Sequence, residues 1–455
     1  MFNEIEIKLR VSPATLERLR QHPLLKKRNK SGWQHSELLN QYYDTPKREL
    51  AQSKVALRVR KDGEQFIQTL KTRGQSVAGL SERHEWDWPL SSNALDHSKL
   101  DDSCWPQELA KLDKSKLAPL FTTNFMRDKA ELAWGRGKQK AVVEAALDQG
   151  QVVAGEQQEP ICELELELRQ GEPSALLELA CELAADVALM PCDISKAERG
   201  YRLFDADSYT LRLPQAQLSS TQTLDEVFAA LGWQLLGSSQ RLAEQYRFNG
   251  HWKLLEQWVE QLLQLRALLS SPGQATPRSS TRALRLTLDA LLDIWQPRAV
   301  AGYSEQAVRD AAPAQFAAEL EQCRWGQLSL NLAHLLITRG WQSERNDKGN
   351  KLGQVAFGNW LLHQLKDDAQ GLSKALMLAE QDPACIREHT PRLSRLCLWL
   401  EHARQLTELS EVDRFYGELN KLRYFAQATT EDSLAACSHQ AHTVRTLKAW
   451  RELTR

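Results

Sequence analysis

The stretch that decides the fold is Glu4-Ile5-Glu6-Ile7-Lys8-Leu9, in which charged and apolar residues alternate strictly. A period of two predicts a β-strand with one charged face and one apolar face. The pattern returns at Cys162-Glu163-Leu164-Glu165-Leu166-Glu167-Leu168, which places three carboxylates on one face. Because both apolar faces must be buried, we expect the two acidic faces to meet inside a closed barrel and to bind metal.

The composition gives the chain little net charge. Its 455 residues include 58 Lys and Arg against 59 Asp and Glu, so the formal net charge is -1. The length predicts two or three domains, and the charge gives no general argument for a nucleic-acid or membrane partner. The sequence has no run of eighteen apolar residues, so we expect no membrane span. The N-terminus does not have the pattern of a signal peptide. We therefore expect a cytoplasmic protein.

The chain changes character near residue 205. Before about residue 200 the pattern is mostly that of strands, and after about residue 220 it is almost entirely that of amphipathic helices. Residues 205–223 between them are rich in Ser, Thr and Gln, which is typical of a linker. We predict a barrel domain at 1–205, a linker at 206–222 and a helical domain at 223–455. Within the helical domain, Gly371 is expected to separate a helix at 355–367 from one at 371–380.

Eight strands are expected in the first half, at 4–10, 38–43, 55–60, 65–71, 82–88, 123–133, 140–147 and 161–169. The Asp62-Gly63 pair predicts a tight hairpin between the third and fourth strands, and Pro89 is expected to end the fifth. Eight antiparallel strands can close into a barrel whose interior holds one small ligand. The predicted fold class is therefore α+β: an eight-stranded antiparallel β tunnel followed by an all-α helical bundle.

Charged residues share one face on almost every predicted strand. A solvated outer face would explain any single strand, but for the whole set an inward face is favoured, because the alternate faces are not apolar enough to fill a barrel. Buried like charges need compensation. Divalent cations neutralise carboxylates, and phosphate oxygens neutralise Lys and Arg, so a metal-complexed tri- or polyphosphate would satisfy both. The residues of this face are Glu4, Glu6, Lys8, Arg58, Arg60, Lys71, Arg83, Glu85, Asp87, Arg127, Lys129, Glu144, Asp148, Glu163, Glu165 and Glu167.

Several short motifs resemble those of one family. About the first 205 residues resemble a CYTH domain, the fold of the triphosphate tunnel metalloenzymes, and this resemblance implies an eight-stranded antiparallel tunnel. The motifs that carry the resemblance are Glu4-x-Glu6-x-Lys8, Tyr43-Asp44-Thr45-Pro46, Leu57-Arg58-Val59-Arg60, Thr69-Leu70-Lys71, Leu147-Asp148-Gln149-Gly150, the strand from Pro160 to Leu168, and Ser195-Lys196-Ala197-Glu198-Arg199-Gly200-Tyr201.

The resemblance also implies roles for individual residues. Metal would be held by Glu4, Glu6, Glu163, Glu165 and Glu167, although which two acids of the last strand share it stays open. Catalytic roles would fall to Glu4, Glu6, Lys8 and Lys196. The triphosphate would be bound by Lys8, Arg58, Arg60, Lys71, Arg83, Arg127 and Lys196, with Glu85, Glu144 and Asp148 in support.

Structural roles remain open for three of these residues. Asp148 could cap a turn at Gln149-Gly150, Glu85 could pair with Arg83 or Arg127, and Lys196 could cap the preceding segment.

The helical half resembles a CHAD domain, and the order of the two parts resembles the CYTH–CHAD inorganic triphosphatases. This implies a polyphosphate partner at the helical domain, although the segment 255–261 is acidic where a basic helix would be expected. The remaining candidate bases are Arg387, His389, Arg392 and Arg395. A second set at spacing three, His442, Arg445, Lys448 and Arg451, is expected to be a solvated face.

These observations together predict an enzyme that hydrolyses inorganic tripolyphosphate to pyrophosphate and phosphate, with Mg²⁺ or Mn²⁺ as cofactor. An adenylyl cyclase of the CYTH type, or a polyphosphate-binding module with a silent barrel, are the alternatives. Residues 135–138, Gly-Arg-Gly-Lys, lack the GxxxxGK[ST] pattern of a phosphate loop and lie between two strands, so a hairpin turn is predicted there.

Overall fold

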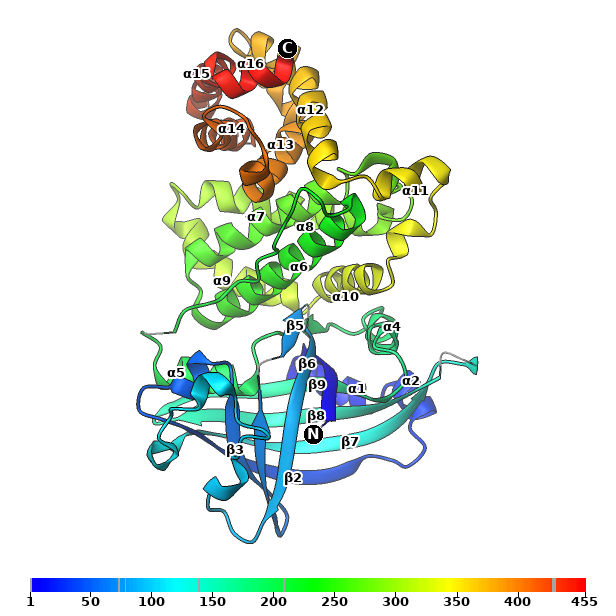
Figure 1. Ribbon diagram of the computed structural model, residues 1–455, viewed down its shortest axis with the longest axis vertical. Helices are drawn as coiled ribbons and strands as arrows, with labels where there is room; N and C mark the ends of the chain where they lie inside the picture. Colours follow the sequence, from blue (N-terminus) through cyan, green and yellow to red (C-terminus); the bar gives the residue numbers. More distant parts are fainter. Residues whose placement is uncertain (1, 73, 78, 138–139, 208, 428–430) are drawn as a thin grey trace. The chain divides into compact units, whose positions relative to one another are not determined.

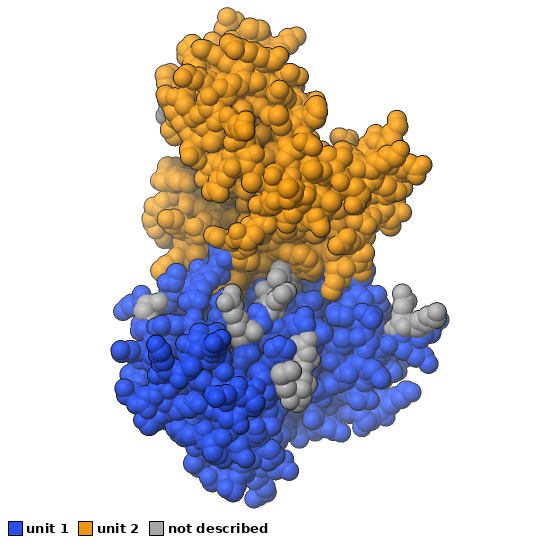
Figure 2. Space-filling model, viewed as in Figure 1, with its two compact units in different colours: residues 1–213, 314–334 blue, residues 214–313, 335–455 orange. Residues whose placement is uncertain are grey.

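The computed structural model describes residues 2–72, 74–77, 79–137, 140–207, 209–427 and 431–455 (Figure 1). The chain forms two compact units, which Figure 2 distinguishes by colour. The first comprises residues 1–213 and 314–334, and the second comprises residues 214–313 and 335–455. The chain first passes between units inside the predicted linker, whose described residues form neither helix nor strand. Residues 314–334, which follow that linker in the sequence, group with the first unit.

The first unit contains a closed barrel. Among the described residues, eight antiparallel strands follow one another in the order β1-β9-β8-β7-β2-β3-β4-β6, and β6 pairs back with β1. The short strands β5 and β10 extend the sheet beside β6 and β1. This confirms the predicted fold class. The strands are β1 (Phe2–Arg10), β2 (Gln34–Asp44), β3 (Ala56–Asp62), β4 (Gln65–Lys71), β5 (Gln75–Val77), β6 (Leu80–Leu90), β7 (Ala118–Trp134), β8 (Ala141–Ala154), β9 (Gln157–Gln170) and β10 (Met190–Pro191).

Strands β1 and β9, which carry the alternating charged and apolar residues, are neighbours in the barrel. In the pairing of β1 with β9, Glu6 lies opposite Glu167 and Lys8 lies opposite Glu165. The intervening residues, such as Leu9 and Leu164, are fully buried. Helix α1 (Pro13–Arg20) packs against β9, and α4 (Ser174–Leu183) packs against β1 and β9. Because successive side chains of a strand point to opposite faces, burying the leucines turns the carboxylates toward the barrel interior.

Two predicted strand ends are wrong. The fifth strand does not stop before Pro89, since β6 continues through it to Leu90. Strand β1 covers β6 only as far as Glu85, so Pro89 has a strand neighbour on one side alone, where a missing N–H can be tolerated. The seventh strand does not stop at Leu147, since β8 runs on to Ala154.

Asp148 therefore lies within a strand, is fully buried and does not cap a turn. The adjacent Gly150 serves close packing, because a Cβ placed there would lie 2.1 Å from the carbonyl oxygen of Asn124 on β7. The chain turns later, at Gly155, whose φ of +59° suits glycine.

Two helices of the first unit begin at serine residues that cap them. Ser12 caps α1 by accepting a 3.2 Å hydrogen bond from the Thr15 amide, and Pro13 takes the first helical position. Ser195 caps α5 (Lys196–Phe204) in the same way, through the Glu198 amide. Helix α5 packs against β7, β8 and β9, which brings Lys196 beside the tunnel. The remaining helices before residue 213 are α2 (Pro23–Arg28), α3 (Glu49–Gln52), and the 3-10 turns at His97–Lys99, Gln107–Leu109 and Lys114–Lys116.

The rest of the described chain is helical. Its α-helices are α6 (Leu224–Asn249), α7 (Trp252–Leu268), α8 (Arg282–Ala301), α9 (Gln306–Leu320), α10 (Cys323–Ile337), α11 (Asp347–Gly353), α12 (Phe357–Ala379), α13 (Thr390–Ala403), α14 (Val412–Gln427), α15 (Glu431–Thr446) and α16 (Lys448–Thr454). Its 3-10 helices are Gly273–Ala275, Gly340–Gln342, Pro383–His389 and Arg404–Leu406. In the part of the chain that is described, no helix is both long and apolar enough to cross a membrane.

One helix break was predicted wrongly. Gly371 does not end a helix but lies inside α12, which is continuous from Phe357 to Ala379. A Cβ at this position would lie 2.2 Å from Nη1 of Arg392 on α13. The glycine therefore makes room for a neighbouring side chain, a tertiary requirement that looks like a helix stop in the sequence.

Candidate active site

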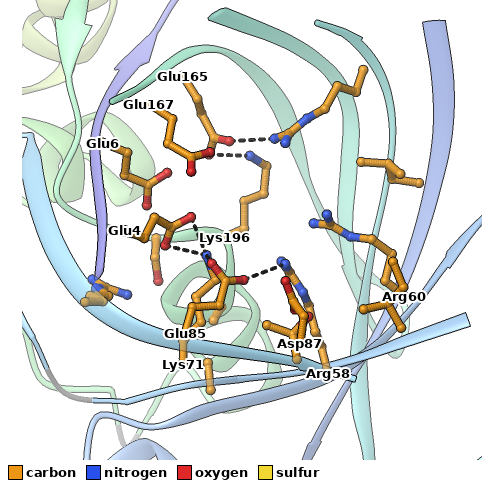
Figure 3. A pocket seen from close by; sticks show the side chains of 18 of the residues that line it. Glu4, Glu6, Arg58, Arg60, Lys71, Glu85, Asp87, Glu165, Glu167 and Lys196 are labelled. Carbon is orange, nitrogen blue, oxygen red and sulfur yellow. Dashed lines mark hydrogen bonds and ion pairs between the residues drawn. The ribbon is translucent and has the colours of Figure 1, made fainter. Parts of the chain in front are cut away.

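The barrel encloses a charged tunnel with a cavity of about 250 Å³ (Figure 3). Its predicted charged face does point inward. The cavity is lined by Glu4, Glu6, Lys8, Arg58, Arg60, Lys71, Arg83, Glu85, Asp87, Arg127, Lys129, Glu144, Glu165, Glu167 and Lys196. Of the predicted site residues, only Asp148 and Glu163 are not part of this lining, and both bond directly to the Lys196 ammonium.

A row of carboxylates crosses three strands at one side of the tunnel. Glu6 on β1 lies opposite Glu167 on β9, and Glu167 lies opposite Glu144 on β8. Burial raises the pKa of Glu167 to about 7; Arg169 opposes this, while Glu4, Glu6 and Glu144 reinforce it. Arg169 pairs with Glu167 at 2.5 Å and with Glu144 at 3.1 Å. Lys8 pairs with Glu6, and Lys71 pairs with Glu4. The three carboxylates of this row and that of Glu4 therefore face three cations, which leaves one negative charge in excess.

Lys71 connects the acidic side to the opposite wall. Its Nζ donates to both carboxylate oxygens of Glu4, at 2.6 and 2.8 Å, and lies 3.2 Å from Oε2 of Glu85. Burial alone would lower the pKa of Lys71, but Glu4, Glu85 and Glu6 raise it above its ordinary value. Arg58 completes the chain at 3.7 Å from Glu85. Glu85 thus pairs with Lys71 and Arg58, and not with Arg83 or Arg127 as the alternative interpretation proposed.

The other wall of the tunnel is basic, and Figure 3 shows Arg58 and Arg60 across the cavity from Glu4 and Glu6. The Nε of Arg60 donates to Oδ1 of Asn40 at 2.7 Å, and no ion pair of Arg60 is found among the described residues. Burial, Arg58 and Arg127 together lower the pKa of Arg60 to about 9. A guanidinium keeps its proton at neutral pH, so the lowering means that burial and the neighbouring guanidinium groups outweigh the opposing charge of Asp148.

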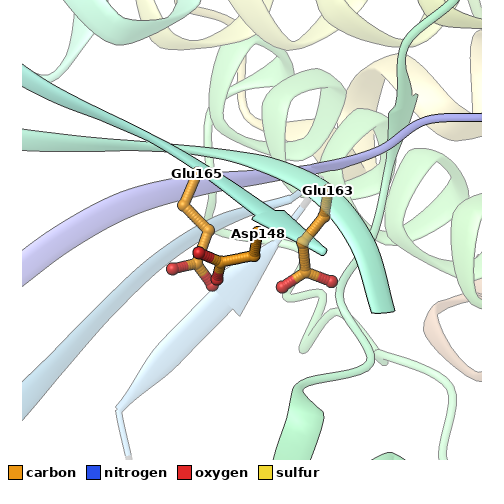
Figure 4. A group of neighbouring side chains, drawn as sticks. All are labelled: Asp148, Glu163 and Glu165. Carbon is orange, nitrogen blue, oxygen red and sulfur yellow. The ribbon is translucent and has the colours of Figure 1, made fainter. Parts of the chain in front are cut away.

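Lys196 occupies the centre of a second acidic cluster. The carboxylates of Asp148, Glu163 and Glu165 converge there (Figure 4), with ligand atoms within 4.8 Å of one another. The Lys196 Nζ donates to Asp148 at 2.7 Å, to Glu165 at 2.9 Å and to Glu163. The residue does not cap the preceding segment, because Ser195 is the N-cap of α5 and the ammonium points into these carboxylates.

Two further bases hold the outer sides of this cluster. Arg127 donates to both Asp148 oxygens at 2.7 Å and to Glu165 at 2.5 Å. The fully buried Arg199 donates to Glu163 at 2.9 Å. Burial would raise the pKa of Glu165, but Lys196, Arg127 and Lys8 hold it well below its usual range. The cluster therefore exists as carboxylates with their own cations.

Sequence reasoning missed three residues of the site. Arg169 follows Glu167 by two positions on β9, so the period of two would have placed it on the charged face. Tyr42 lies opposite Arg58 in the pairing of β2 with β3, and its hydroxyl is 3.5 Å from the Arg58 Nη1. Arg199 stands inside a motif singled out from the sequence, but no local pattern indicates that it binds Glu163.

Some candidate bases of the second unit pair with acids. Arg395 pairs with the fully buried Asp368 through both Nε, at 3.2 Å, and Nη2. Arg392 lies 3.5 Å from the same carboxylate, and Arg445 pairs with Glu380. Polyphosphate binding at the helical part stays a prediction that these contacts do not support.

The fold and the site define the first unit as a closed antiparallel β tunnel with a lumen of opposed charges. Residues 3–201 match the family model of the CYTH domain, and this part of the chain is a CYTH domain. Over 203 residues the chain is 36% identical to an inorganic triphosphatase of Haemophilus influenzae. The matched region covers 45% of this chain and 55% of the relative. The chain thus spans about half the length of the curated relative it matches.

The solved structures that resemble the chain are more distant from it. One is a Hippeastrum protein described as a proposed adenylyl cyclase with a dominant triphosphatase activity. It is 19% identical to this chain, the match covers 44% of this chain and 95% of that one, and the TM-score is 0.32. Another is a proposed adenylate cyclase of Bacillus halodurans. It is 22% identical to this chain, the match covers 41% of this chain and 90% of that one, and the TM-score is 0.26. At these values neither likeness says anything about activity.

Proposed function

We propose that the tunnel hydrolyses inorganic tripolyphosphate to pyrophosphate and phosphate with the help of a divalent cation. The observation that carries this proposal is the arrangement of charge in one small cavity. A carboxylate row with excess negative charge faces a guanidinium wall in which Arg60 has no ion pair among the described residues. A linear triphosphate with a bound cation has the complementary distribution.

The carboxylate row fits a hard cation. Glu4, Glu6, Glu144 and Glu167 offer only oxygen ligands, and they carry more negative charge than their neighbouring bases neutralise. Mg²⁺ and Mn²⁺ prefer such donors, and they are usually held by one or two carboxylates plus phosphate oxygens and water. When bound, such a cation neutralises phosphate charge and makes a water molecule easier to deprotonate.

The bases of the tunnel would bind and orient the substrate. Arg60, which lacks a compensating acid, is the first candidate for a phosphate contact, and Arg58 and Arg127 line the same wall. Guanidinium groups bind phosphate through paired hydrogen bonds. Water attacks the terminal phosphorus in line with the bridging oxygen, the P–O bond breaks, and pyrophosphate leaves while these bases hold its charge. The acids Glu4 and Glu6 would act at the opposite end, toward the attacking water.

The relative supports the reaction type. The Haemophilus influenzae protein is named an inorganic triphosphatase, and its 36% identity extends over 203 residues, about the length of the tunnel domain. Since the match covers 55% of that protein, the activity of this whole chain rests on the tunnel geometry and on experiment.

A substrate panel tests the proposal. Purified protein is incubated with tripolyphosphate, pyrophosphate, ATP or thiamine triphosphate, with Mg²⁺, Mn²⁺ or EDTA, and released phosphate is measured. We expect release from tripolyphosphate with at least one metal and none in EDTA. If tripolyphosphate releases no phosphate with Mg²⁺ and none with Mn²⁺, the proposal is refuted. Formation of cyclic AMP from ATP would instead favour the cyclase alternative.

A further inference from the structure

The surroundings of the Lys196 ammonium leave it no free donor. An ammonium has three N–H groups, and those of Lys196 are accepted by three different carboxylates, Asp148, Glu163 and Glu165. The Phe125 ring covers the ammonium at 4.8 Å from its centroid, a contact that favours a cation. A phosphate oxygen therefore has no N–H to accept while this arrangement holds.

The cluster is also electrically balanced. Its three carboxylates face Lys196, Arg127 and Arg199, the last of which also lies 3.7 Å from Glu159. Lys8 adds a cation 3.9 Å from Glu165, so the cluster has no excess negative charge, and the side chain of Asp148 is 0% exposed. Introducing a divalent cation would leave an excess of buried positive charge, which is costly in a low dielectric. The distances of 2.7 and 2.9 Å from Nζ to Asp148 and Glu165 are those of ammonium–carboxylate hydrogen bonds, whereas Mg²⁺ would need about 2.0–2.1 Å.

We infer that Lys196 is a tethered cation that fills the Asp148–Glu163–Glu165 cluster, so that divalent metal binds in this tunnel only at the row that includes Glu6 and Glu167. Lys196 is then a positioning residue: it fixes Glu165, and through Asp148 it fixes Arg127 at the phosphate-binding wall. Glu163 is not a metal ligand but a link between Lys196 and Arg199. The inference rests on the proposed function, because it concerns where the divalent cation of that function binds. Its test measures metal binding and needs no turnover.

Counting metal ions tests it. Mn²⁺ is titrated by calorimetry, without substrate, into the full-length wild type and into Lys196→Met, Lys196→Arg and the double variant Lys196→Met with Asp148→Asn. We expect Lys196→Met to bind one Mn²⁺ more per chain than the wild type, because three uncompensated carboxylates then form an oxygen site. Lys196→Arg, which keeps the charge, and the double variant should show the wild-type number. An unchanged number for Lys196→Met would overturn the inference.

A second pair of variants decides the matter if Lys196→Met does not fold. Glu163→Gln should change the Kd of wild-type Mn²⁺ binding less than about twofold, whereas Glu167→Gln should weaken it about tenfold or more. A larger loss in Glu163→Gln than in Glu167→Gln would make Glu163 a ligand and overturn the inference. If the wild type binds no Mn²⁺ while Lys196→Met binds one, the inference stands and the proposed metal-dependent function fails, so the two failures are distinguishable.

Discussion

Glu6 and Glu167 lie directly opposite each other where the first strand of the barrel pairs with the last long one. Like charges at opposed positions of an antiparallel pair destabilise a sheet. Here the pair faces a tunnel, with Glu144 next in the same row. The arrangement costs stability in the free protein and is useful only when a cation is present, so it indicates a binding role.

The first prediction concerns this pair. Glu6→Gln should lower kcat/KM for tripolyphosphate about 100-fold or more, because the lost carboxylate contributes several kcal/mol to holding the cation. The thermal midpoint of the metal-free protein should change little, since the repulsion with Glu167 is relieved while the ion pair with Lys8 is lost. Phosphate release and thermal melting measure the two effects. Glu37→Gln, at an exposed position of β2, is the matched control. Unchanged kcat/KM in Glu6→Gln would remove this residue from the metal site.

A second prediction concerns the basic wall. Arg60→Gln should raise KM for tripolyphosphate about 10- to 100-fold, the value of one or two charged hydrogen bonds. It should not destabilise the substrate-free protein, because Arg58 and Arg127 repel Arg60 and help to lower its pKa to about 9. Initial rates and thermal melts without substrate test both parts. Arg136→Gln, at an exposed position between β7 and β8, should leave KM unchanged. A KM in Arg60→Gln equal to that of the wild type would place the substrate elsewhere.

A third prediction concerns nucleotides. We expect kcat/KM for ATP to be at least about tenfold below that for tripolyphosphate, since a missing stacking contact costs about 1–3 kcal/mol. Of the aromatic residues lining the cavity, Tyr42 already stacks on Phe121 with centroids 4.9 Å apart. The other, Phe125, is covered by Lys196 and Arg127. Comparing the two substrates at equal free metal measures the ratio, and ATP turnover equal to that of tripolyphosphate would contradict it.

A fourth prediction concerns the pH dependence of stability in the helical part. Burial lowers the pKa of His402 to about 4, although Glu260 opposes the shift. The unfolded chain, with an ordinary histidine pKa near 6.5, binds more protons than the folded chain between these values. Stability is therefore present above about pH 6.5 and is lost as the pH falls toward 4, by up to roughly 3 kcal/mol.

Replacement of this histidine tests the sign. In His402→Gln the fall in the free energy of unfolding between pH 7 and pH 5 should be smaller than in the wild type. Urea unfolding followed by circular dichroism at each pH measures the difference. His363→Gln, at an exposed position of α12 in the same unit, should keep the wild-type dependence. Equal pH slopes in the wild type and His402→Gln would show that this group does not titrate on unfolding.

Local residue chemistry explains which predictions of structure succeeded. The alternation on the first and last long strands and the Asp62-Gly63 hairpin both act within a few residues, and both are found in the structure. Pro89, Gly150 and Gly371 suggested breaks and are instead continuous with their strands or helix. Gly150 and Gly371 lie against residues of other segments, and Pro89 lies where β1 no longer pairs with β6.

The sequence by itself determined the faces. A period of two decides which side chains point into a barrel once their neighbours are buried, so Glu4, Glu6, Glu165, Glu167 and the bases between them were predictable as a charged lumen. Tertiary structure alone decided which charged side chains form ion pairs with one another. The closing of β1 on β9 and the position of α5 deliver Lys196 and Arg199 to Glu163, leaving the row at Glu6 and Glu167 in excess negative charge. The reason is that an ion pair depends on register and distance between segments as far apart in the chain as Lys8 and Glu165, and no local pattern encodes these.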